Sequence, residues 1–109
     1  MKIYVKLFKR KFDVNSSNKN VRKAYELQLS LAKVNSEKDP IKRAETQLAT
    51  IKSVSKFLGD VLHLNQHQMD LLDGMSFDET LNEVGYVSQR LMGLSDEQIN
   101  AEEHEDPKK

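Results

Sequence analysis

The stretch IKRAETQLATIKSVSKFLGDVL, residues 41–62, decides the fold of this chain of 109 residues. One set of its positions recurs at steps of three and four over three heptads: Ile41, Ala44, Leu48, Ile51, Ser55, Leu58 and Leu62. This spacing is the a/d pattern of a helix that packs along another helix. Val54, Phe57 and Val61 add a second stripe beside its C-terminal half, so we expect that half to contact two neighbours.

The second stripe leaves two interpretations open. In the first, both neighbours belong to the same chain, and the widened face is part of the core. In the second, part of the face binds another chain through apolar side chains, as helix-binding surfaces do. The candidate partner-binding residues are then Val54, Phe57, Leu58 and Val61.

The residues before this stretch predict where it starts and also predict another helix. Asp39 followed by Pro40 is a start signal for residues 41–62, because Asp caps a helix and Pro suits its first position. Upstream, after the polar break at 15–18, a helix is expected to run to about Asn35. Its apolar face is marked by Val21, Ala24, Tyr25, Gln28, Leu31 and Ala32, with Leu27 and Val34 widening it.

Two more helices are predicted after it. Asn65 with Gln68 resembles a cap that opens a short helix, and Gly74 ends that helix. Ser76 with Glu79 fits a capping box, in which the serine oxygen and the glutamate each satisfy a free backbone N–H. The last helix then closes at Gly93 and directs inward the residues Phe77, Leu81, Val84 and Leu91.

The N-terminal residues 1–15 predict a β-hairpin. Ile3, Val5 and Leu7 alternate with polar or aromatic residues, which is typical of a half-buried strand. A two-residue loop at Lys9-Arg10 would oppose Leu7 to Phe12 and Val5 to Val14. Lys-Arg is a poor type I′ turn, so a longer loop stays open as an alternative.

These elements predict a mainly α fold. We expect a single domain over residues 1–94, a bundle of about four helices with a small N-terminal β-hairpin. Residues 95–109 carry six acidic and two basic residues, and Ile99 is their one sizeable apolar residue. This composition predicts a flexible acidic tail.

Composition excludes several classes of protein. The chain has no Cys, which removes disulfides, thiolate catalysis and cysteine-based zinc sites. No apolar run is long enough for a membrane span, and basic residues interrupt the place where a secretory signal would need its apolar stretch.

The residues suggest no catalytic chemistry. No phosphate-binding glycine loop and no local nucleophile motif occur. His63 and His67 lie four apart, as a metal-binding pair on one helix would, but the Asn65 cap is expected to break the helix between them. We therefore predict solvent-facing histidines, no catalytic residue, no metal site, no cofactor and no enzyme.

The charge is balanced in total and divided along the chain. Up to Lys56 there are 14 basic and 5 acidic residues, a net of +9, and the remainder carries a net of −9. Such a chain could associate head to tail with copies of itself, with Lys6, Lys9, Arg10 and Lys11 as the candidate self-association residues. Alternatively, the two halves neutralise each other within one molecule. The basic cluster could also hold nucleic acid, although a net charge of zero argues against that partner.

Three segments resemble one family. They are the opening MKIYVKLFKRKFDVNSSNKNVRKAYELQLSLAKVNSEKD, the helix ending in VSKFLGDVLHLN, and SFDETLNEVGYVSQRLMGLS. Together they resemble the tail assembly chaperones of long, flexible-tailed phages (siphophages) that infect Gram-positive bacteria. The resemblance runs from Met1 to about Ser95.

The resemblance implies a non-enzymatic protein of the host cytoplasm. Such a chaperone coats the tape-measure protein and keeps it soluble until tail-tube protein polymerises around it, and it is absent from the mature virion. The resemblance also implies a homo-oligomer and a longer product made by ribosomal frameshifting, with no membrane partner. Two alternatives stay open, a small nucleic-acid-binding regulatory protein and a structural tail adaptor.

Overall fold

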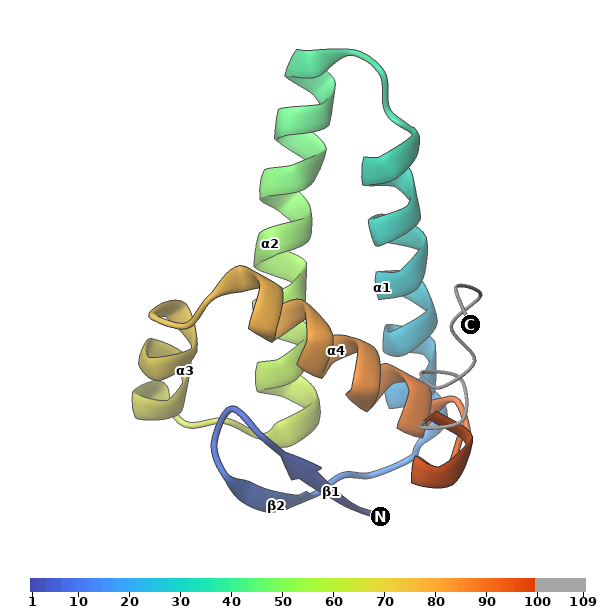
Figure 1. Ribbon diagram of the computed structural model, residues 1–109, viewed down its shortest axis with the longest axis vertical. Helices are drawn as coiled ribbons and strands as arrows, with labels where there is room; N and C mark the ends of the chain where they lie inside the picture. Colours follow the sequence, from blue (N-terminus) through green and yellow to red (C-terminus); the bar gives the residue numbers. More distant parts are fainter. Residues whose placement is uncertain (100–109) are drawn as a thin grey trace, which may run out of the picture.

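The computed structural model describes residues 1–99. It confirms a mainly α fold with a small N-terminal hairpin, in the order β1 (Lys2–Val5), β2 (Arg10–Asp13), α1 (Asn18–Ser36), α2 (Pro40–Leu62), α3 (Gln66–Asp73) and α4 (Phe77–Leu91). Helices α1 and α2 form an antiparallel pair, and α4 crosses their lower half (Figure 1). The hairpin lies at the base, and α3 lies to one side of α2.

Short polar side chains start α1 and α2 where the sequence predicts. The Ser17 hydroxyl accepts a hydrogen bond from the backbone N–H of Asn20 at 3.2 Å. The Asp39 carboxylate accepts one from the N–H of Ile41 at 3.0 Å, and Pro40 takes the first helical position. Each bond satisfies a backbone donor that has no partner within the helix.

The two later helices also begin at their predicted caps. Asn65 and Gln68 form a reciprocal capping box, with N···O distances of 2.8 and 3.0 Å. The Ser76 hydroxyl accepts from the N–H of Glu79 at 3.3 Å. Gly93, with φ of 100°, follows the end of α4 in a conformation that favours glycine.

The hairpin forms, but its predicted register is wrong. Ile3 pairs with Phe12 and Val5 pairs with Arg10, so the loop spans four residues, Lys6–Lys9. Only Lys9 takes a positive φ, of 53°, whereas a two-residue type I′ loop requires it at both positions. The shift between predicted and observed pairing is an even number of residues, so each side chain keeps its predicted face.

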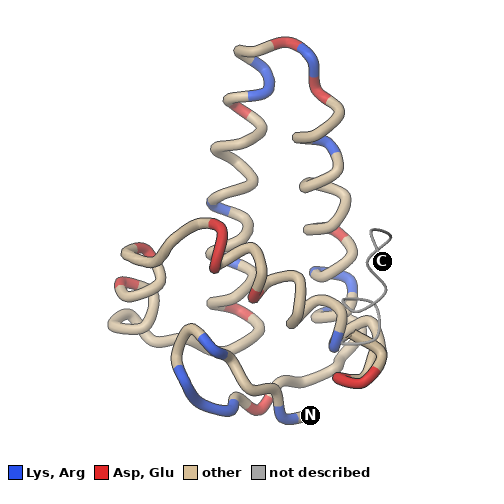
Figure 2. Tube along the Cα trace, viewed as in Figure 1, with Lys and Arg blue, Asp and Glu red and all other residues tan. Residues whose placement is uncertain are grey.

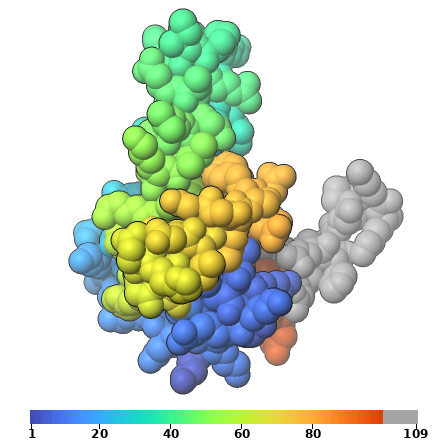
Figure 3. Space-filling view, turned by 90° about the vertical axis from the view of Figure 1, so that its left-hand side faces the viewer, coloured from blue at the N-terminus to red at the C-terminus, as the bar shows by residue number. Residues whose placement is uncertain are grey.

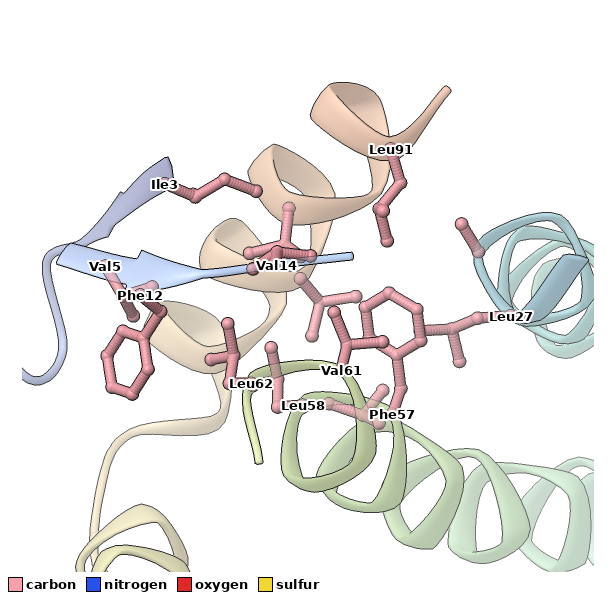
Figure 4. Packing of buried hydrophobic residues seen from close by; sticks show 14 of the residues in the cluster. Ile3, Val5, Phe12, Val14, Leu27, Phe57, Leu58, Val61, Leu62 and Leu91 are labelled. Carbon is pink, nitrogen blue, oxygen red and sulfur yellow. The ribbon is translucent and has the colours of Figure 1, made fainter. Parts of the chain in front are cut away.

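The core lies where the hairpin, α4 and the C-terminal half of α2 meet (Figure 4). The hairpin contributes Ile3, Val5, Phe12 and Val14, all buried. Helix α1 adds Ala24 and Leu27, whereas Tyr25 of its predicted face is exposed. Helix α4 adds Val84, Val87 and Leu91. This core holds the base of the α1–α2 pair and leaves its far end projecting.

The described structure continues past residue 94, where the domain was expected to end. Residues 96–99 are helical, and the Ser95 hydroxyl accepts from the N–H of Gln98 at 3.2 Å. The Arg90 guanidinium binds the Asp96 carboxylate at 2.8 Å, and Ile99 is only 4% exposed. Residues 95–99 therefore pack on the domain rather than forming the start of a tail. The rest of the predicted tail, 100–109, lies outside the described residues.

Candidate functional site

The far end of the α1–α2 pair, which we call the arm, carries an exposed apolar stripe on α2. Ile41 is 72% exposed, Leu48 is 56% exposed and Ile51 is 38% exposed, and Ala44 lies exposed between them. These four residues are the N-terminal half of the predicted a/d pattern, and we call them the arm stripe. Leu58 and Leu62 continue the same pattern and are buried at the base. The arm projects above α3 and the start of α4, which do not reach its far end (Figure 3).

The side of α2 that faces α1 in the arm is polar. Thr50 is buried and Gln47 is half-buried, one and two turns before the buried Val54. An apolar face normally turns towards the neighbouring helix, because burial removes its surface from water. In the arm, the polar residues of α2 face α1 instead, so the apolar arm stripe is exposed to solvent.

A groove between α2 and α3 continues the arm stripe towards the base. It has a volume of about 500 Å³ and begins at Ile51. Its lining is apolar at Leu64 and Met69 and charged at its rim, where Lys52, Lys56, Asp60 and Asp73 lie. The stripe and the groove together form one track along α2 that a helical segment could occupy.

The four predicted partner-binding residues lie inside the chain's own core. Val54, Phe57, Leu58 and Val61 are 0–4% exposed. In Figure 4, Phe57 lies beside Leu27 of α1, while Leu58 and Leu62 lie towards the hairpin. The intramolecular interpretation fits this conformation, because the four residues expose almost no surface to a partner.

Residues 1–106 match the family described as phage tail assembly chaperone proteins (TAC). The chain belongs to this family. The match covers nearly the whole chain, including every helix and strand of the described residues. The family is one of chaperones rather than enzymes, and its partners are phage tail proteins. No curated protein and no solved structure matches the chain significantly.

The predicted self-association residues of this tail assembly chaperone lie on and beside the hairpin loop. Lys6, Lys9, Arg10 and Lys11 are all exposed. Figure 2 shows that basic residues gather along the hairpin at the base of the molecule. The Arg10 guanidinium lies 5.0 Å from the centre of the Phe12 ring, a cation–π distance. Within residues 1–99 none of the four side chains forms an ion pair. Their role in self-association stays a prediction.

An ion-pair cluster joins the basic half of the chaperone to its acidic half. The Lys23 ammonium lies 3.1 Å from an Asp60 carboxylate oxygen, and the Lys56 ammonium lies 3.2 Å from the same oxygen. This cluster joins α1 to α2 and neutralises part of the charge within the molecule. The hairpin loop keeps its positive charge exposed.

The histidines of the chaperone do not share a helix. His63 caps the C-terminus of α2 with φ of 56°, whereas His67 lies in α3, and both are exposed. Among residues 1–99, no group of three His, Cys, Asp or Glu side chains could hold a metal ion. In the same range, no helix has the length and apolar content that crossing a membrane requires.

Proposed function

We propose that this tail assembly chaperone binds the tape-measure protein through the arm stripe and keeps it soluble in the host cytoplasm. One observation supports this surface above all: Ile41, Leu48 and Ile51 stay exposed on a helix whose other large apolar residues are buried. A tape-measure protein is long and largely helical, as the family resemblance implies. Its own apolar stripes have no partner before the tail tube forms.

The proposed binding mode is helix against helix. A client helix lies along the arm stripe, and its end enters the groove beside Leu64 and Met69. Full burial of one Leu or Ile side chain contributes about 1.5–3 kcal/mol at most, so each contact is modest. Weak contacts repeated along a long client hold it through multivalency and still allow tail-tube protein to displace the chaperone.

Co-expression with the tape-measure protein tests this proposal. The measurement is the fraction of the tape-measure protein that stays soluble and co-purifies with the chaperone. We expect Ile41→Ser/Leu48→Ser to lower both, because the two changes remove the most exposed part of the arm stripe. The matched control is Leu29→Ser on α1, which changes a side chain that is 65% exposed outside the stripe. The proposal would be overturned if the tape-measure protein were equally soluble with the wild type, with the double variant and with the control variant.

Purified virions separate a chaperone from a structural tail adaptor. A chaperone leaves when the tube assembles, so we expect the chain to be absent from finished particles by mass spectrometry. Its presence in fixed stoichiometry would contradict the proposal and support the adaptor.

A further inference from the structure

We propose that the arm stripe is also the contact between two copies of this chain, which pair antiparallel through α2 about a two-fold axis. The stripe has the spacing that two-helix packing requires, with Ile41 and Leu48 at a positions and Ala44 and Ile51 at d positions. Within residues 1–99 nothing covers it. A self-complementary patch pairs with its own copy in a closed, two-fold arrangement.

The charges beside the stripe favour the antiparallel orientation. Glu45 and Lys52 are exposed, lie seven residues apart, and so share one flank of the stripe. When the axis passes between Ala49 and Thr50, Glu45 of each copy lies two residues, about 3 Å along the helix, from the level of Lys52 of the other, which is within reach of the lysine side chain. Two equivalent ion pairs of opposite charge result. In a parallel pair, this flank of one copy would face the other flank of its partner. That flank carries the uncharged Gln47 and Val54, so the two ion pairs could not form.

The same register also accounts for the apolar residues. Leu48 of each copy lies against Ile51 of the other, at the centre of the contact. Ile41, the most exposed large apolar side chain of the stripe, reaches the level of Leu58 in the second copy. The groove lined by Leu64 and Met69 opens beside that level and can receive it. The exposed stripe of one copy thus fits the stripe and groove of the other.

This inference concerns the chain without its client and does not rest on the proposed function. Pairing of two copies and binding of the client both use the arm stripe, so the second copy and the client cannot occupy it at the same time. The pair then protects the stripe until a client replaces the second copy.

A charge-swap series measured by sedimentation velocity and light scattering tests the pairing. We expect the mass of the wild type to rise with concentration from 12.6 kDa towards twice that value. Glu45→Lys alone and Lys52→Glu alone place like charges opposite each other and should each hold the mass at that of one chain. The double variant Glu45→Lys/Lys52→Glu restores opposite charges and should pair again. An equimolar mixture of the two single variants should also pair.

Two outcomes would overturn the proposal. One is a wild type that stays monomeric at millimolar concentration. The other is pairing that Glu45→Lys leaves unchanged while Lys9→Glu/Lys11→Glu abolishes it, which would assign self-association to the hairpin loop. All substituted residues are exposed, and circular dichroism checks that each variant folds. Glu45→Lys keeps the stripe apolar, so loss of pairing without loss of tape-measure solubility separates this proposal from the proposed function.

Discussion

The Lys23 ammonium on α1 lies 3.1 Å from the Asp60 carboxylate on α2, although 37 residues separate the two along the chain. The hydrogen bond from Lys23 is the main reason that the pKa of Asp60 lies below its ordinary value of 3.8. Lys56 lowers this pKa further, and burial acts against both lysines. The contact ties the two helices together at the base of the arm.

The loss of stability that follows removal of this contact should depend on pH. At neutral pH, Lys23→Gln should lower the free energy of unfolding by about 0.2–1 kcal/mol, the range for partly exposed ion pairs. A depressed pKa in the folded state stabilises above the unfolded value of 3.8, and this stabilisation is lost as the pH falls through the folded pKa. Urea unfolding curves of the variant and the wild type should therefore converge in acid.

Lys19→Gln is the control for this prediction. It removes a lysine that is exposed on the same helix and forms no ion pair within residues 1–99. A difference between Lys23→Gln and the wild type that stays constant down to pH 2 would contradict the assignment.

Glu83 on α4 should show the opposite pH dependence. It is only 6% exposed, and its Oε1 is buried without a hydrogen-bond partner. Burial raises the pKa of its carboxyl above the ordinary value of 4.5, although the nearby backbone N–H groups of Lys6 and Leu7 lower it in part. A raised acid pKa means that stability is fully present below the unfolded value and falls as the pH rises through the folded one. Glu83→Gln stays neutral, so its melting temperature should exceed that of the wild type at pH 7 and match it in acid.

Glu83→Ala separates the charge of this side chain from its contact with the hairpin loop. The alanine removes the carboxyl group near the backbone N–H groups of Lys6 and Leu7, and a buried polar group left unsatisfied costs about 1–3 kcal/mol. We expect this variant to melt below the wild type at both pH values. A Glu83→Gln variant that also melts lower at pH 7 would show that the buried charge is not the dominant effect.

Local sequence signals predict where the helices begin. Asp39, Asn65 and Ser76 each cap the helix predicted for them, because capping depends on residues within one turn. The hairpin register was predicted less well, since it depends on the backbone angles of a loop in which only Lys9 turns left-handed. The alternation of the strands nevertheless identified their buried faces.

The candidate site could not be located from the α2 pattern alone. Ile41 and Leu58 occupy equivalent a/d positions, yet one is exposed and the other is fully buried. The difference arises from where α4 crosses the helix pair, which is a long-range property of the fold. Thr50 and Gln47 were the overlooked signal, because polar residues on the side of α2 that faces α1 leave the apolar side of the arm turned to solvent.

Leucine truncation along α2 should measure this difference. Leu58→Ala removes a fully buried side chain from the core and should lower the free energy of unfolding by about 2–5 kcal/mol. Leu48→Ala changes an exposed position and should stay within about 0.5 kcal/mol of the wild type. Chemical unfolding of dilute, monomeric protein gives both values. A large loss for Leu48→Ala under those conditions would mean that the arm stripe is packed within the monomer.

Glycine-to-alanine changes in two helices should have different effects. At Gly85 in α4, an added Cβ would meet no atom within 4 Å, so Gly85→Ala should stabilise the chain by about 0.5–1 kcal/mol through helix propensity. At Gly59 in α2, the Cβ would lie 2.9 Å from the sulfur of Met69, which must move. We expect Gly59→Ala to gain less than Gly85→Ala or to lose stability. In a Met69→Ala background the obstacle is gone, and Gly59→Ala should then give the full gain. Equal effects of Gly59→Ala in both backgrounds would show that Met69 does not pack closely against α2.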